Sequence, residues 1–337
     1  MNILVTGGAG YLGSVLLPKL LGRGHKLRVL DIGYFGIGHL RAMQPSIQLV
    51  REDLRKIALN PDLCNEAIEG CDCIIHLAAL SNDQSAELNP EITDEVNTKA
   101  TYALAEAARK KGIKFIFSSS CAIYGESRGE ADEESRLEPI SIYAKSKVNA
   151  ENAILSIANS TWKPVILRNG SLFGYSPRMR FDLVINIFSL YSVLRNELKV
   201  FGEGLQWRPF IHVKDVARAI GFFTEKERVN YSCYNIANKN LRVIDLLPVF
   251  QEINPNVKIT KVKLDKEDNR NYKVSTKRMR DEGFEPSINV DYGAEEIIEA
   301  IIGGQIPDPE SIYYQNAKWL KELNPNLDPS LVAKMKQ

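Results

Sequence analysis

Short apolar runs alternate with longer amphipathic stretches through the first half of the chain. Six runs predict strands: NILVT (2–6), KLRVLD (26–31), IQLV (47–50), CIIHLA (73–78), KFIFSS (114–119) and KPVILR (163–168). Helical patterns lie between them at 11–22, 91–111 and 142–158. Strands that alternate with helices of ten or more residues indicate βαβ crossovers. The pattern therefore predicts an α/β fold of the Rossmann type, with a doubly wound parallel sheet.

This alternation ends at Gly170. Beyond it, the helical stretch FDLVINIFSLYSVL is followed by short strands and by helices near 213–225 and 242–252, a mixture typical of a smaller α+β lobe. We expect three parts: a sheet domain at 1–170 to which some later segments return, a second lobe at 171–302, and a C-terminal appendage at 303–337. Since no low-complexity linker separates the lobes, we expect a ligand between them.

Composition narrows the class of protein. Of 337 residues, 44% are hydrophobic and 25% charged, and 43 Lys and Arg nearly balance 42 Asp and Glu, which gives no sign of a nucleic-acid or membrane surface. The five cysteines are scattered and predict reduced thiols without a metal site. The chain opens directly on a strand pattern, and no window approaches about 18 apolar residues, so we expect a cytoplasmic protein.

A glycine-rich turn follows the first predicted strand. In VTGGAGYLGS, Gly7, Gly10 and Gly13 lie between that strand and a helix, where backbone amides and the positive helix end can bind a pyrophosphate. GYFGIG (33–38) has no such context, and we interpret it as a loop. Asp31 closes the second strand, where a carboxylate binds both ribose hydroxyls and repels a 2′-phosphate. A plain turn capped by Asp31 is the alternative.

The same region suggests which dinucleotide is bound. After Asp31 the chain has no arginine until Arg41, which favours NAD over NADP. Asp53 and Leu54 come just past the third strand, where the adenine edge would lie.

Tyr143 and Lys147 lie four residues apart in ISIYAKSKVNAE, hence on one helix face. The spacing alone proves little, since Tyr314 and Lys318 repeat it. The first pair differs because the glycine turn, Asp31 and a row of hydroxyls in SSSCAIYG precede it, and these would converge at the carboxyl ends of the strands.

These residue types suit proton and hydride transfer. A phenol titrates near ~10, and a lysine ammonium together with a positive nicotinamide ring would lower that value. The Tyr143 phenolate could then take a proton from a sugar hydroxyl while hydride leaves the same carbon. Ser120 would hold the reacting oxygen and Lys147 the nicotinamide ribose. We expect Ser118 and Ser119 to satisfy backbone groups at the strand end.

Taken in order, these motifs resemble those of the extended short-chain dehydrogenase/reductase superfamily, in its nucleotide-sugar epimerase/dehydratase branch. The resemblance covers about residues 1–300 and also rests on HLAAL (76–80) and RPFIHVKDVARA (208–219). It implies NAD in the first domain, a nucleoside-diphosphate sugar under the second lobe, and a homodimer formed through the helices at 91–111 and 142–158. The cofactor contacts that it implies are Gly7, Gly10, Tyr11, Leu12, Gly13, Asp31, Asp53, Leu54, Leu77, Ala78, Ala79, Asn97, Tyr143 and Lys147.

Departures from the family pattern narrow the reaction. The 4,6-dehydratases carry an Asp-Glu pair at the positions of Cys121 and Ala122, and decarboxylating members keep a Glu at the second. Neither a thiol nor a methyl group replaces a carboxylate as acid and base, so both reactions are disfavoured. We interpret Cys121 as structural; a catalytic thiol is the alternative.

Reactions that need only hydride transfer at C4 remain. We favour a nucleotide-sugar 4-epimerase. The alternatives are a 4-dehydrogenase or 4-keto reductase, because SPRMRFDLVIN (176–186) is similar to a segment of GDP-heptose 4-dehydrogenases. A dinucleotide-sensing binding protein would be expected to lose the Tyr143–Lys147 pair or gain a basic face.

The second lobe should neutralise a diphosphate, for which arginine is best suited. Arg208 and Arg270 match the family's diphosphate-binding arginines, whereas Arg178 and Arg180 reach either the substrate or surface salt bridges. The expected substrate-binding residues are Ser81, Asn82, Ser171, Arg178, Arg180, Asn186, Arg208 and Arg270.

Overall fold

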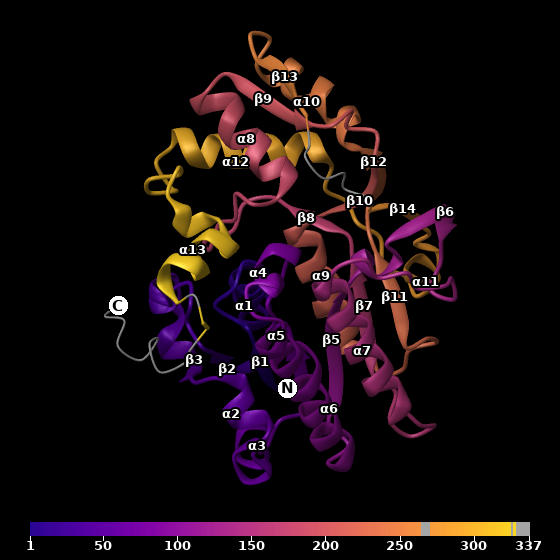
Figure 1. The fold of residues 1–337 in the computed structure, drawn as a ribbon. Helices are drawn as coiled ribbons and strands as arrows, with labels where there is room; N and C mark the ends of the chain where they lie inside the picture. Colours follow the sequence, from indigo (N-terminus) through magenta and orange to yellow (C-terminus); the bar gives the residue numbers. More distant parts are fainter. Residues whose placement is uncertain (264–269, 325, 328–337) are drawn as a thin grey trace.

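The computed structural model describes residues 1–263, 270–324 and 326–327. Its centre is a seven-stranded parallel sheet in the order β11-β7-β5-β4-β1-β2-β3 (Figure 1). The strands are β1 (Asn2–Thr6), β2 (Lys26–Asp31), β3 (Ile47–Arg51), β4 (Cys73–His76), β5 (Lys114–Ser120), β7 (Val165–Asn169) and β11 (Cys233–Ile236). The predicted α/β fold is confirmed.

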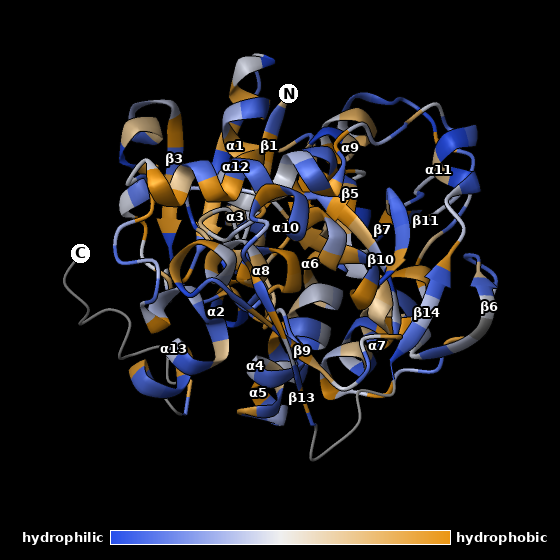
Figure 2. Ribbon diagram, turned by 90° about the horizontal axis from the view of Figure 1, so that it is seen from above, coloured by the Kyte–Doolittle hydropathy of each residue, from blue (hydrophilic) through white to orange (hydrophobic). Residues whose placement is uncertain are grey.

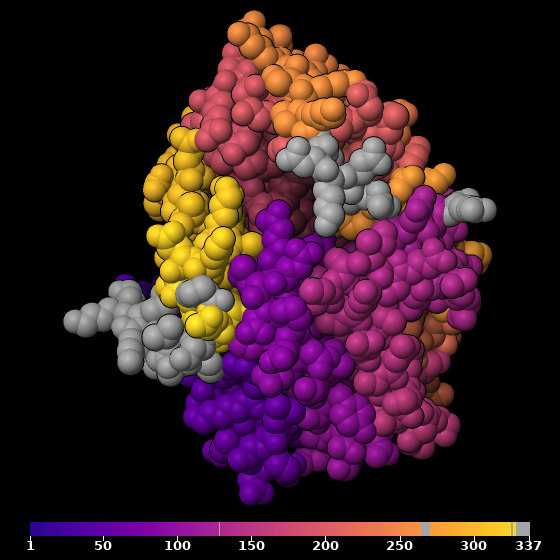
Figure 3. All heavy atoms as spheres, viewed as in Figure 1, coloured from indigo at the N-terminus to yellow at the C-terminus, as the bar shows by residue number. Residues whose placement is uncertain are grey.

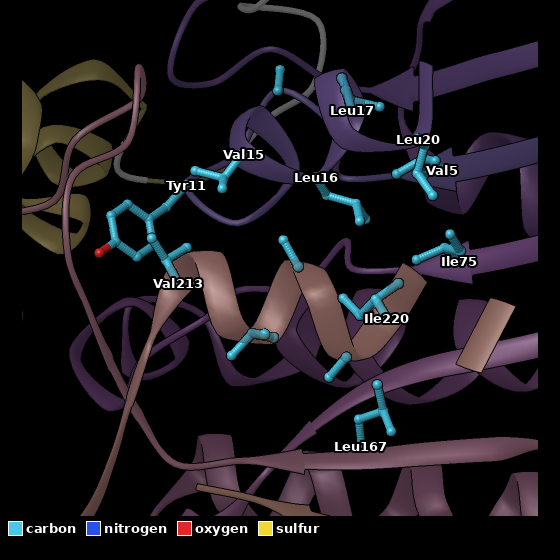
Figure 4. Close-up of a cluster of buried hydrophobic side chains, with 14 of the residues drawn as sticks. Val5, Tyr11, Val15, Leu16, Leu17, Leu20, Ile75, Leu167, Val213 and Ile220 are labelled. Atoms are coloured by element: carbon cyan, nitrogen blue, oxygen red, sulfur yellow. The ribbon is translucent and has the colours of Figure 1, made fainter. Parts of the chain in front are cut away.

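The central strands are buried on both faces, since every residue of β4 and β7 is buried. Their continuous apolar sequences fit a parallel sheet that helices cover on both sides. In Figure 4, Val213 of α9 (Val213–Glu225) lies beside Tyr11, and Ile220 of the same helix lies between Leu16 of α1 (Gly13–Gly22) and the strand residue Leu167. The helices α6 (Ala100–Lys110) and α7 (Ile142–Ser156) contact each other and β5 in a separate buried cluster.

Two predicted helices differ in detail from the observed ones. The helix expected at 91–111 is α5 (Pro90–Asp94), a π-helical turn (Glu95–Lys99) and α6 in succession. The helix expected from residue 11 begins at Gly13, because the glycine turn occupies the preceding residues and Gly7 has a positive φ of 72°. The short helices α2 (Leu54–Ala58), α3 (Pro61–Ala67) and α4 (Asp83–Glu87) complete this half.

The second lobe has its own core, which includes Phe173, Phe188, Phe210 and Phe250. It contains the three-stranded sheet β12-β10-β8 and the pair β13-β9, while β14 pairs with β6. The elements are β6 (Glu126–Ala131), β8 (Ser171–Phe173), α8 (Val184–Leu194), β9 (Glu197–Phe201), β10 (Trp207–His212), β12 (Lys239–Arg242), α10 (Leu247–Ile253), β13 (Lys258–Val262), β14 (Asn271–Val274), α11 (Lys277–Asp281) and α12 (Val290–Ile302). Figure 2 shows β14 as largely hydrophilic, whereas β9 and β13 mix hydrophilic and hydrophobic residues. The exact division into domains stays a prediction.

The chain from residue 303 to residue 324 returns to the sheet domain. Figure 3 shows it running down one side of the molecule to the N-terminal segment. Its helix α13 (Asn316–Leu323) contributes Leu320, which with Leu327 packs against Tyr34 and Leu80. This part of the expected appendage is therefore integrated into the core. Among the described residues, no helix combines the length and apolar character needed to cross a bilayer.

Candidate active site

A cleft of about 500 Å³ runs along the carboxyl ends of the sheet strands, between the two lobes. It brings together most of the residues that the sequence predicts for cofactor and substrate. Those lining it are Gly7, Gly10, Tyr11, Leu12, Gly13, Asp31, Asp53, Leu54, Leu77, Ala78, Ala79, Ser81, Asn82, Ser120, Tyr143, Ser171, Arg178, Arg180, Arg208 and Arg270. Asn97, Lys147 and Asn186 do not line it.

The glycine turn packs directly on the end of β4. A Cβ atom on Gly7 would lie 2.6 Å from the backbone nitrogen of Ala78, and one on Gly13 would lie 2.4 Å from the Gly8 carbonyl oxygen. Both positions therefore require glycine. The turn leads into the first helix, whose first N–H groups have no acceptor within the helix. This is a cradle for a pyrophosphate at the cleft wall.

Asp31 is fixed at the neighbouring strand end. Its carboxylate accepts hydrogen bonds from the backbone N–H of Ala9 (2.9 Å) and of Gly33 (2.8 Å). Burial raises the pKa of Asp31, which these two bonds and the charge of Arg178 oppose. The carboxylate thus stands rigidly at the position expected for ribose recognition.

The side chain of Asp53 caps the N-terminus of α2. It accepts the backbone N–H of Arg55 at 2.8 Å and pairs with the guanidinium of the same residue at 2.7 Å. Asn97 supports the cleft from behind: its side-chain oxygen accepts the Leu80 N–H (2.9 Å), and its amide group donates to the Ser146 hydroxyl (3.0 Å).

Tyr143 and Ser120 meet in the cleft. Tyr143 lies in the first turn of α7, which Ser141 caps, and its side chain lies near Ser120, which also lines the cleft. Burial raises the pKa of Tyr143 to about 12; the charge of Asp83 acts in the same direction, and Ser120 opposes it. Among the groups of the protein itself, burial therefore outweighs Ser120 and the charge of Arg180, which lower this pKa.

Lys147 lies beneath the cleft floor. Its ammonium donates to the Ser118 carbonyl (2.9 Å) and stands 5.9 Å from the centre of the Tyr143 ring. Burial lowers the pKa of Lys147 to about 7, partly offset by Glu151. Burial thus favours the neutral amine of Lys147, and a negative charge nearby favours its ammonium form.

The hydroxyls of Ser118, Ser119 and Ser120 have different partners. The expectation that Ser118 and Ser119 satisfy backbone groups was wrong. The Ser118 hydroxyl accepts the Asn169 amide (2.9 Å), and Ser119 donates to the Glu151 carboxylate (2.5 Å), which is ion-paired with Arg168 (2.7 Å). These hydroxyls bind side chains and not backbone groups, because α7 and β7 place polar side chains beside the strand end. Ser120 lies near Tyr143, and its hydroxyl accepts the backbone N–H of Ala122 (3.1 Å).

The next two residues carry no acid or base. The Cys121 thiol is fully buried and donates to the Arg168 carbonyl (3.0 Å), and burial raises its pKa. Ala122 offers the cleft a methyl group.

Two arginines stand together at the far end of the cleft. Arg208 donates to the Trp207 carbonyl (2.8 Å) and to the Arg270 carbonyl, and its guanidinium lies 5.4 Å from the centre of the Tyr272 ring. The Arg270 side chain pairs with Asp83.

The segment after β8 is tied to the glycine turn. Asn186 is fully buried, with bonds to Gly174 N (3.1 Å), the Arg180 carbonyl (2.9 Å) and the Tyr11 hydroxyl (3.2 Å). It therefore holds this segment in place and does not point into the cleft. Arg180 pairs through two bonds with Asp182 (2.9 and 3.0 Å).

The sequence analysis placed one lining residue, Arg178, at the wrong end of the cleft and missed two others. Arg178 stacks at 3.9 Å on the centre of the Phe35 ring, at the Asp31 end of the cleft and not at the substrate end. Asn316 and Leu320 line the cleft from the C-terminal segment. Only the amphipathic pattern around residue 316 pointed to a packed helix there, and nothing in it indicated a ligand.

This fold and site define a dinucleotide-dependent enzyme of the short-chain dehydrogenase/reductase type. Residues 3–237 match the family model described as "NAD dependent epimerase/dehydratase family", and the chain belongs to that family. Its cofactor is therefore NAD, and the glycine cradle and fixed Asp31 fit it.

Known relatives span several reactions on nucleotide sugars. The chain is 30% identical to an uncharacterized UDP-glucose epimerase of Bacillus subtilis, over 73% of this chain and 81% of the relative. It is 29% identical to a probable dTDP-glucose 4,6-dehydratase of Sinorhizobium fredii, over 89% and 92%. The Thermotoga maritima UDP-glucose 4-epimerase, solved with UDP-glucose, superposes with a TM-score of 0.80 at 27% identity, over 91% of this chain and all of its own.

Proposed function

We propose that this protein is a nucleotide-sugar 4-epimerase in which Tyr143 is the proton-transferring residue and Ser120 positions the reacting C4 oxygen. The observation that carries the proposal is that Ser120 lies near Tyr143 in the cleft, where it lowers the pKa of the phenol, and is followed by a buried thiol and a methyl group at positions 121 and 122. The site thus offers groups for proton transfer at one hydroxyl and lacks the carboxylates that elimination needs at those positions.

Other carboxylates near the sugar end are engaged. Asp83 is paired with Arg270, and Asp182 with Arg180. Burial would raise the pKa of Asp182, but the Arg180 guanidinium outweighs it and lowers this pKa, which makes Asp182 a poor proton donor at neutral pH. This supports a reaction confined to C4.

The residues act in sequence on the bound sugar. Tyr143 removes the proton of the 4-hydroxyl, Ser120 holds the oxygen, and Lys147 stabilises the phenolate. When bound, NAD supplies the hydride acceptor and returns the hydride to C4. Tyr143 then gives its proton back to the oxygen, which completes the inversion if the sugar presents its other face.

The substrate is proposed to be a nucleoside-diphosphate sugar. Arg208 and Arg270 stand side by side at the end of the cleft, where two guanidinium groups match a diphosphate. Ser81 and Ser171 line the cleft and would contact the sugar. Because two of the relatives named above are described as UDP-glucose epimerases, UDP-sugars are the first to test.

A second candidate is net oxidation or reduction at C4, favoured by the similarity of residues 176–186 to GDP-heptose 4-dehydrogenases. It uses the same residues and differs only in the fate of the hydride. Incubation with UDP-, dTDP- and GDP-sugars, followed by product stereochemistry at C4 and NADH absorbance, separates the two. The 4-epimer without net NADH supports the proposal. Stoichiometric NADH with a 4-keto product contradicts it in favour of the second candidate.

We further propose a cytoplasmic homodimer formed through α6 and α7. Tyr102 on α6 is a large apolar side chain with 37% exposure, which supports an interface there. Light scattering of the wild type and Tyr102→Glu tests it: a dimer that becomes monomeric supports this face, and an unchanged state contradicts it.

A further inference from the structure

Residues 306–324 and 326–327, called here the C-terminal segment, form part of the wall of the cofactor end of the cleft. It is anchored on the loop after β2: Trp319 Nε1 donates to the Tyr34 carbonyl (2.8 Å), and the Tyr34 hydroxyl donates to the Leu327 carbonyl (3.0 Å). The Tyr313 hydroxyl also donates to the Phe35 carbonyl. Since this loop begins just after Asp31, the segment covers the adenosine side of the expected dinucleotide.

Two buried side chains in this wall have polar atoms without acceptors or donors. Asn316 is 4% exposed, and its Oδ1 has no hydrogen-bond partner among the described residues. Arg178 is 1% exposed, and its Nε and Nη2 likewise lack partners in the part of the chain that the structure describes. Both residues line the cleft. Buried polar groups are normally satisfied, so these atoms point to a bound molecule with donors and acceptors of its own.

The electrostatics of this corner fit the same ligand. Arg178 lies within the field of Asp31, and its guanidinium rests on the Phe35 ring. The Tyr314 carbonyl accepts the N–H of Phe181, which ties the Arg178 segment to the C-terminal segment (2.8 Å). The guanidinium of Arg178, the amide of Asn316 and the carboxylate of Asp31 therefore line the same end of the cleft, where they can bind the ribose and phosphate groups of a nucleotide.

We propose that Arg178 and Asn316 are contacts for the adenosine diphosphate half of NAD, and that the C-terminal segment closes this half in and slows its release. The inference does not depend on which sugar reaction is catalysed. A retained cofactor suits any cycle in which the hydride returns. The solved Thermotoga relative matches 91% of this chain with its full length, so part of this chain has no counterpart in it.

The test measures binding of NAD and of ADP, without any sugar, by titration calorimetry and by stopped-flow displacement. Asn316→Ala is expected to weaken both ligands about tenfold, the value of one hydrogen bond, through faster release. Arg178→Met should weaken both by about tenfold to a hundredfold. Lys318→Ala, at an exposed position of the same helix, is the control and should bind like the wild type.

Two outcomes would overturn the proposal. If Asn316→Ala and Arg178→Met both bind ADP and NAD as tightly as the wild type, neither Asn316 nor Arg178 contacts the cofactor. Weakened NAD with unchanged ADP would place the contacts on the nicotinamide half. If thermal unfolding shows that Arg178→Met does not fold, Arg178→Lys takes its place beside Asn316→Ala. The same measurements of NAD and ADP binding to these two variants then test the proposal. A failed 4-epimerase assay leaves this result untouched.

Discussion

Arg270 and Asp83, 187 residues apart in sequence, form an ion pair across the substrate end of the cleft. Asp83 also accepts the hydroxyl of Ser141, which caps the helix that carries Tyr143. The arginine proposed for the diphosphate is therefore linked, through one carboxylate, to the proposed catalytic tyrosine. A change of charge at Arg270 or Asp83 should therefore alter the pKa of Tyr143.

Asp83→Asn should shift the pH dependence of turnover. The negative charge of Asp83 raises the pKa of Tyr143, since it disfavours the phenolate. Removing that charge lowers the pKa, so the rise of kcat/KM with pH should move to lower pH. Asp94→Asn, on the exposed side of α5, is the control and should leave the profile in place. A profile for Asp83→Asn that moves to higher pH would rule this coupling out.

Arg208→Ala should weaken binding before it affects chemistry. Hydrogen bonds to charged groups contribute about 1.5–3 kcal/mol, so the Kd for UDP or another nucleoside diphosphate should rise about tenfold to a hundredfold. Arg242→Ala on the adjacent strand, where Arg242 pairs with Asp245, is the matched control. Equal affinities of both variants for every nucleoside diphosphate tested would exclude Arg208 from the site.

Asp31→Ala should weaken NAD and narrow its advantage over NADP. The carboxylate is fixed by two backbone N–H groups, so its loss removes both ribose recognition and the repulsion of a 2′-phosphate. Asp31→Asn keeps a hydrogen-bonding side chain without the charge and should recover part of the NAD affinity. Kd values for both cofactors check this, and an unchanged ratio would contradict it.

Cys121→Ser should retain most activity. The thiol is fully buried, its raised pKa keeps it protonated, and a serine hydroxyl can donate to the same Arg168 carbonyl. Iodoacetamide should also leave the activity of the native enzyme unchanged, because the Cys121 thiol is buried. A fall of turnover beyond about a hundredfold, on the order of 2.7 kcal/mol in the barrier, would instead make the thiol catalytic.

The sequence predicted the sheet and much of the cleft because those features depend on local patterns. The strand ends at Asp31 and Ser120 lie where the apolar runs stop, and helical spacing placed Tyr143 and Lys147 on one face. The bonding of Asn186 to Tyr11 and the direction of Arg178 could not be predicted, because they depend on how the segment after β8 packs on the glycine turn.

The C-terminal segment escaped prediction for a related reason. Helix α13 lies against the cofactor end of the cleft because hydrogen bonds join residues almost three hundred positions apart in sequence, such as Tyr34 and Leu327. The contribution of burial to the pKa of Tyr143 could not be predicted either, since residue types reveal nearby charges but not the depth at which a side chain is buried.

The central claim is that Tyr143 transfers the proton during hydride transfer at C4. Tyr143→Phe keeps the ring and its packing and removes only the hydroxyl. On the sugar that the wild type converts, turnover should fall about 10²–10⁴-fold, while the Kd values for NAD and for the nucleotide sugar stay within about twofold of the wild type. Undiminished turnover of Tyr143→Phe would contradict the account, whichever sugar is used.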